Sequence, residues 1–381
     1  MIQSSMIEYL LEILKTSEPQ VCATICWSLS RYAKSLFKLD KKGDFFKRYL
    51  QELMLMVMSI NTLVQEAACT SVILLIAIAE DKLFPYANDI LQVLVNAIQI
   101  YKPTTLTRLY NAIAKLIEAA IQSDDKEDLL NVLFEKWNEM KDDDKVLCSL
   151  MECIKCILLK FGLKFGKWIQ LIIKKILRLL SKYLALINED IDTVKVSIGD
   201  TRIVIKSIEI FNAICELLKE NVERYLIDNN VLELCKCKDV QVRQYGCFSI
   251  GVIARTAKNY FKNHLLNSIP ILVSYIHSNE EVQVIQSCCK SLCDIILTHP
   301  ELTPNFSNEC AIRFINILQG TRVNRELGKS IGTLIGILSL YDPTSIIPYL
   351  DHVLRFLCAS LKELDDREYK QLAFKYLFTY R

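Results

Sequence analysis

The feature that most constrains this chain is a repeat of about 40 residues, each holding two apolar segments with helical spacing. The segment Val21–Ala33 carries its apolar residues on one stripe of a helix, and Pro19 precedes it where a proline fits the first helical turn. Similar segments recur downstream, most plainly at Val240–Lys258 and Val282–Leu297, which both open on Val-Gln-Val. Helix pairs repeated at this period stack side by side, so the sequence predicts an all-α superhelix.

The whole chain divides into nine such pairs. They are predicted over 4–15 with 19–37, 45–59 with 64–79, 83–100 with 106–121, 128–140 with 146–161, 167–187 with 203–218, 222–235 with 240–258, 261–276 with 282–297, 310–318 with 323–340, and 346–361 with 368–380. Two helices without a third short one favour HEAT over armadillo repeats. We therefore expect one continuous HEAT-repeat solenoid over 1–381, with an inserted loop over 188–200.

Composition narrows the function classes. The 10 glycines and 8 prolines are too few for hairpins or Gly-rich loops, and 46 Lys+Arg against 44 Asp+Glu give no field that calls for nucleic acid or an anionic membrane. The most membrane-like segment, Trp168–Ile187, is interrupted by four cations and is predicted to be an amphipathic helix. The first residues lack a signal peptide pattern, so the 15 cysteines are expected to be buried thiols in a reducing compartment.

Neither end of the chain is expected to carry the terminal repeat that caps a complete solenoid. Apolar Leu10, Ile13 and Trp27 have no preceding repeat to cover them, and the chain ends on the aromatic-rich run Phe374–Phe378. Terminal repeats of a complete solenoid present a polar outer face. The sequence therefore predicts a piece of a longer solenoid.

Motifs for catalysis or metal binding are missing from the sequence. The four histidines are scattered, and no HExxH, GxSxG, GxGxxG or phosphate-binding loop occurs. The close cysteines Cys235, Cys237, Cys288 and Cys289 are expected to be buried thiols, since a zinc site needs two such pairs within reach. We expect no enzyme, no metal and no cofactor.

Carboxylates and one indole are the candidate binding groups. Trp27 is either a core tryptophan or a surface anchor, and each carboxylate is either a solvated side chain or part of a binding face. The carboxylates on predicted second helices, which would line one face of the superhelix, are Glu118, Glu152, Glu209, Glu216 and Asp294. The residues alone thus predict an all-helical scaffold that binds something extended.

Several short runs resemble the transportins, the karyopherin-β2 nuclear import receptors of the importin-β superfamily. In chain order they are CWSLSRYA (26–33), VQEAAC (64–69), LYNAI (109–113), EKWNEMKDDDK (135–145), LMEC (150–153) and VRQ (242–244). The resemblance implies the C-terminal, cargo-binding half of a receptor whose Ran-binding N-terminal half is missing. It also implies shuttling between cytoplasm and nucleus, with Ran and nucleoporins as partners and no direct nucleic-acid or membrane partner.

The resemblance further implies a cargo site. In the family, an extended Pro-Tyr nuclear localisation signal lies on the concave face, and Trp27 matches a tryptophan that contacts its Pro-Tyr end. Ile205 matches an apolar contact, and three carboxylates match acids set against the basic part of the signal. The implied cargo-binding residues are Trp27, Glu152, Ile205, Glu209 and Glu216.

The chain also departs from the family at positions that face the signal. Acidic family positions are Ala77, Asn111 and Val252 here, and a second cargo tryptophan is Lys290. These changes predict weaker binding of strongly basic signals. The alternative is a HEAT scaffold for phosphatase or ubiquitin-ligase assemblies, and a concentration of negative charge on the second helices would favour the receptor over it.

Overall fold

The computed structural model describes residues 8–14, 18–39, 44–121, 127–162, 166–188, 198–225, 230–257, 261–277, 280–319, 325–349 and 351. In these ranges the regular elements are all helices, and the all-α HEAT-repeat prediction is confirmed. The chain divides into two compact units, Met1–Trp168 and Ile169–Arg381. That both units form one continuous domain stays a prediction.

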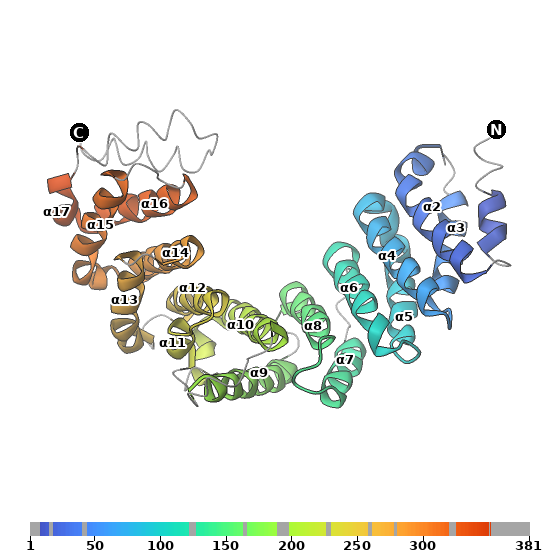
Figure 1. Ribbon diagram of the computed structural model, residues 1–381, viewed down its shortest axis with the longest axis horizontal. Coiled ribbons are helices and arrows are strands. Elements are labelled where there is room, and N and C mark those ends of the chain that lie inside the picture. The colour runs from blue at the N-terminus through green and yellow to red at the C-terminus, as the bar shows by residue number, and fades with distance from the viewer. Residues whose placement is uncertain are drawn as a thin grey trace. The chain divides into compact units, whose positions relative to one another are not determined.

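The first unit contains four helix pairs in its described part. A helix over 8–14 precedes α2 (Pro19–Leu39), α3 (Asp44–Val57), α4 (Thr62–Ala79), the 3-10 helix η1 (Glu80–Tyr86), α5 (Ala87–Ala97), α6 (Pro103–Ala120), α7 (Glu127–Glu139) and α8 (Leu147–Phe161). The second helices α2, α4, α6 and α8 pack on one another in sequence and form one layer, beside the layer of first helices (Figure 1). This is the stacking that the repeat predicts.

The second unit has the same two layers. It contains α9 (Gly166–Asn188), α10 (Ile198–Leu218), η3 (Lys219–Tyr225), α11 (Asn230–Cys235), α12 (Val240–Ala257), α13 (Lys262–His277), α14 (Val282–Thr298), η5 (Pro300–Asn305), α15 (Ser307–Gln319), α16 (Arg325–Tyr341), α17 (Pro343–Ile346) and η6 (Ile347–Tyr349). Here α10, α12, α14 and α16 are the stacked second helices.

Small residues let α12 and α14 pack closely. A Cβ added at Gly251 would lie 2.7 Å from the Cα of Ser291, and the Ser291 hydroxyl donates to the Cys247 carbonyl at 2.7 Å. The Gly251 N–H in turn donates to Ser291 Oγ at 3.2 Å. Elsewhere the layers are joined by side chains such as Leu53 and Ile154, which are fully buried. Burial of these apolar faces is the main stabilising term of the stack.

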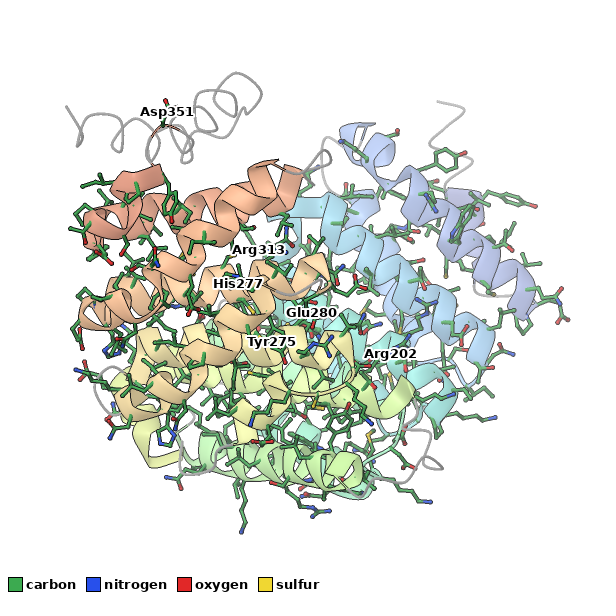
Figure 2. The ribbon with its side chains drawn as sticks, turned by 60° about the vertical axis from the view of Figure 1, so that its left-hand side comes forward. Arg202, Tyr275, His277, Glu280, Arg313 and Asp351 are labelled. Carbon is green, nitrogen blue, oxygen red and sulfur yellow. The ribbon has the colours of Figure 1, made fainter. Side chains whose placement is uncertain are left out.

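An arginine fixes the turn between α11 and α12. Arg243 donates to the Cys237 carbonyl at 2.5 Å and pairs with Glu280 at 2.7 Å, and its guanidinium lies 5.9 Å from the ring centre of Tyr275. Figure 2 labels Tyr275 and Glu280. Since Glu280 precedes α14, this cluster ties one repeat to the next.

The element boundaries differ from the prediction in several places, and the described start of the predicted helix 346–361 is the end of α17 followed by η6. The predicted helix 83–100 is η1 followed by α5, because Pro85 lies in the first part and lacks the N–H that a helix interior needs. The predicted helix 222–235 is likewise η3 and the short α11, and α10 begins five residues before residue 203. Most of the expected loop 188–200, the last pair beyond 351, and Phe374–Phe378 lie outside the described residues.

Candidate peptide-binding face

Trp27 lies on the surface. It projects from α2 with 49% of its area exposed, and the guanidinium of Arg31, one turn further on, lies 5.0 Å from the ring centre. The helix needs no contact from the indole, because Cys26 and Leu29 on the opposite side supply its buried face. Trp27 is therefore a surface residue and not a core tryptophan.

Glu152 lies on α8 in the same unit, on the exposed side of the second-helix layer. Its carboxylate is half-buried and pairs with Lys155 at 2.9 Å. Glu118 on α6 has the same arrangement with Lys115 at 2.7 Å, and this hydrogen bond raises the pKa of Lys115. Both carboxylates therefore already have a cation three residues away.

The candidates of the second unit share one face of α10. Ile205, Glu209 and Glu216 follow one another at helical spacing, and each is at least partly exposed. Lys206 pairs with Glu209 at 2.6 Å. Burial and the charge of Glu209 together raise the pKa of Tyr245 on the neighbouring α12.

Arg255 links three second helices. It extends from α12 to Glu216 on α10 at 2.5 Å and to Asp294 on α14 at 2.6 Å. Burial raises the pKa of Asp294 although Arg255 lowers it. Beside this cluster lies a cavity of about 430 Å³, and its lining residues are Glu216, Lys219, Glu220, Arg255 and Thr256. A basic ligand would have to compete with Arg255 for both carboxylates.

The departures from the family pattern differ in exposure. Ala77 is exposed on α4 and Asn111 is half-buried on α6, so both lie where a ligand could reach them. Val252 is fully buried and takes no part in a surface site. Lys290 is exposed, and its ammonium lies 4.7 Å from the ring centre of Phe248.

Negative charge is not concentrated on the second helices of the first unit, so by this criterion alone the first unit favours the scaffold alternative over the receptor. Among side chains that the structure describes, these helices carry six cations and three carboxylates. The cations are Arg31, Lys34, Arg108, Lys115, Lys155 and Lys160, and the carboxylates are Glu66, Glu118 and Glu152. Counting all charges on these helices, not acids alone, would have shown this from the sequence.

The cysteines of the described residues are free thiols, and all but Cys148 and Cys156 are buried. Burial raises the pKa of Cys156 to about 11. In the described part of the chain no group of three His, Cys, Asp or Glu residues is arranged to hold a metal ion. There, α4 rather than α9 is long and apolar enough to cross a membrane by length and composition alone, and 50% of it is buried as in a core helix.

The solved structures that this fold resembles define its class. Crystalline importin-β superposes with a TM-score of 0.70 at 13% identity, over 98% of this chain and 52% of that one. Yeast importin-β (Kap95p) superposes with a TM-score of 0.78 at 12% identity, over 96% of this chain and 45% of that one. The chain therefore has the HEAT-repeat solenoid fold that these structures share.

Sequence similarity identifies the relatives more closely, although no family model matches. Human transportin-1 is 27% identical over 386 residues, covering 98% of this chain and 42% of its own length. Transportin of Dictyostelium discoideum is 24% identical, covering 98% and 41%, and importin subunit beta-2 of Schizosaccharomyces pombe is 25% identical, covering 96% and 42%. The chain is thus similar to transportins over nearly its whole length, and it spans less than half the length of these relatives.

Proposed function

We propose that this chain is the peptide-binding part of a nuclear import receptor. The layer of second helices would hold an extended segment of the cargo, with Trp27 against a Pro-Tyr type end of the signal. The observation that carries this proposal is the exposed indole on α2 of a chain similar to transportins, since an exposed aromatic of this size is a favoured anchor at protein interfaces. The chain acts by binding, not by catalysis.

An indole suits this ligand chemically. Proline offers a flat apolar ring without an N–H donor, and stacking on an aromatic face buries it without an unmet hydrogen bond. Arg31 beside the indole can pair with a carboxylate near the peptide end. The carboxylates Glu152, Glu209 and Glu216 would contribute to binding a basic stretch only after leaving their own cations.

The partners follow from the relatives and are part of the proposal. A solved structure of Kap95p concerns its binding of RanGDP and another is a Kap95:Nup1 complex, and this chain superposes on them with TM-scores of 0.61 and 0.64. We propose that the receptor likewise engages Ran and nucleoporins and moves between cytoplasm and nucleus. Ran-driven release would need residues outside this chain, so Ran alone should not displace peptide from it.

Replacing Trp27 tests the peptide site. Trp27→Ala should weaken binding of a fluorescent peptide ending in Pro-Tyr by roughly 10- to 100-fold, the usual loss for an interface anchor. Fluorescence anisotropy measures it, and circular dichroism checks that the fold is kept.

The matched control is Tyr32→Ala, which removes a more exposed aromatic of the same helix, 66% against 49%. Tyr32 lies on a different side of α2 from Trp27, so Tyr32→Ala should not change the affinity for the peptide. Equal affinity of Trp27→Ala and wild type would remove Trp27 from the site.

A further inference from the structure

The exposed face of α4 is mostly apolar, with Glu66 and Thr70 as its polar members. We call its apolar part the α4 strip, and the members of the strip are Leu63, Ala67, Ile73, Leu74, Ala77 and Ile78. Leu63 is 46% exposed, and the one charged residue of the helix is Glu66. A helix face that exposes this many apolar side chains is typical of an interaction site.

The helices that pack on both sides of α4 carry exposed cations. Arg31 and Lys34 lie on the exposed face of α2, and Arg108 lies on that of α6. Residues about 40 apart lie level on neighbouring second helices, as the hydrogen bond between Gln65 and Thr105 shows at 3.2 Å. By this spacing Arg31 and Lys34 lie level with the second half of the α4 strip, and Arg108 with its first half.

These three cations are uncompensated. In the described part of the chain, none of them forms an ion pair with a carboxylate, whereas Lys115 and Lys155 on α6 and α8 each do. The first unit therefore presents a mostly apolar helix face that carries one carboxylate, Glu66, with three cations on the helices at its sides. A basic peptide would meet repulsion here, and an acidic one would meet attraction.

We propose that the first unit binds an extended peptide segment in which apolar side chains alternate with Asp or Glu. The apolar side chains would rest on the α4 strip, and the carboxylates would pair with Arg31, Lys34 and Arg108. This inference deepens the proposed function and rests on it, because it assigns the charge of the cargo segment next to the end held by Trp27.

A peptide fits this surface better than a nucleic acid. The α4 strip is aliphatic, so it offers neither donors to phosphates nor rings on which bases stack. Its apolar side chains instead match Leu, Ile or Val of an extended chain. Arginine and lysine beside such a surface then select acidic neighbours in the peptide.

Two peptides of equal length test the charge preference. Both carry the same apolar residues and end in Pro-Tyr, but one has Asp and Glu between them and the other has Lys. At low ionic strength the wild-type chain should bind the acidic peptide at least about tenfold more tightly than the basic one. This difference in affinity should decrease as salt screens the charges. Anisotropy titrations at about 0.05 and 0.5 M salt measure both.

Charge reversal tests the named residues. Lys34→Glu with Arg108→Glu should invert the order of the two peptides, and it leaves Arg31 on the indole untouched. The matched control is Lys47→Glu with Lys145→Glu, which reverses two exposed cations of the same unit outside the second helices. The control should keep the wild-type order.

Ala77→Glu with Asn111→Asp should shift the preference toward the basic peptide by adding carboxylates beside the α4 strip.

The outcomes separate this inference from the proposed function. Tighter binding of the basic peptide, weakened by Trp27→Ala, would overturn the acidic preference and leave the peptide site standing. Binding of neither peptide would overturn both. Tighter binding of a single-stranded RNA that displaces the acidic peptide would show that the occupant is a nucleic acid and would overturn the inference.

Discussion

Single residues set the charge that a ligand meets on this protein. Glu152 and Glu209 each have a lysine three residues away on their own helix, and Arg255 holds Glu216 and Asp294. Most of these pairs are half-buried, and their main effect on a ligand is that they neutralise the carboxylates. Arg243 and Glu280 differ, because their side chains are only 12% and 15% exposed.

Glu280 should make stability depend on pH. Burial would raise its carboxyl pKa, but the hydrogen bond from Arg243 overrides burial and holds the pKa below 4.5. A lowered carboxyl pKa stabilises the folded state above pH 4.5, and this contribution is lost as the pH falls through the folded value. Glu280→Gln should therefore lower the free energy of unfolding by about 1–3 kcal/mol at pH 7 and by progressively less below pH 4.5.

Urea titrations from pH 7 to about pH 3, followed by circular dichroism, measure this effect. The control Glu8→Gln changes an exposed pair with Arg48 at 3.4 Å and should cost under about 1 kcal/mol at every pH. If Glu280→Gln lowers the free energy of unfolding by the same amount at every pH, the pH dependence does not come from Glu280.

Helices are the next scale, and their spacing depends on small residues. The contact of α12 with α14 leaves no room for a Cβ at Gly251, whereas Gly166 at the start of α9 has no other atom within 4 Å of an added Cβ. Close packing of the second helices fixes which side chains remain on the exposed face. The apolar α4 strip is exposed for the same reason, since its neighbours α2 and α6 cover only the flanks of α4.

Gly251→Ala should destabilise the second unit. Overpacking costs about 1–3 kcal/mol, and the better helix propensity of alanine offsets up to about 1 kcal/mol of it. We expect a net loss of about 1–2 kcal/mol in urea unfolding. Gly166→Ala is the matched control and should stay within about 0.5 kcal/mol of wild type. An unchanged midpoint for Gly251→Ala would show that α14 moves away without cost.

At the scale of the whole molecule, contacts between neighbouring repeats determine whether the unfolding of one repeat destabilises the next. Of the three tryptophans, Trp27 and Trp137 lie within the first unit, and Trp168 is its last residue, on the helix α9 that continues into the second unit. Tryptophan fluorescence thus reports mainly on the first unit, while circular dichroism follows every helix. Nearest-neighbour coupling in a continuous solenoid would transmit a local destabilisation along the stack.

Gly251→Ala therefore also tests the single-domain prediction. In one continuous solenoid, the urea midpoint by tryptophan fluorescence should fall together with the midpoint by circular dichroism. Gly166→Ala should move neither. If circular dichroism splits into two transitions and the fluorescence midpoint stays at its wild-type value, the units unfold independently and the single-domain prediction is wrong.

The sequence by itself determined the helix pairs, their order, the HEAT class and the transportin resemblance, because helical periodicity and the 40-residue repeat are local properties of the chain. It placed Glu209 and Glu216 on a second helix for the same reason, whereas Ile205 became a candidate through the resemblance. Only the tertiary structure decided that Trp27 is exposed, that Val252 is buried and that Arg255 pairs with Glu216 and Asp294. These facts depend on residues about 40 positions away, which come into contact when neighbouring repeats stack.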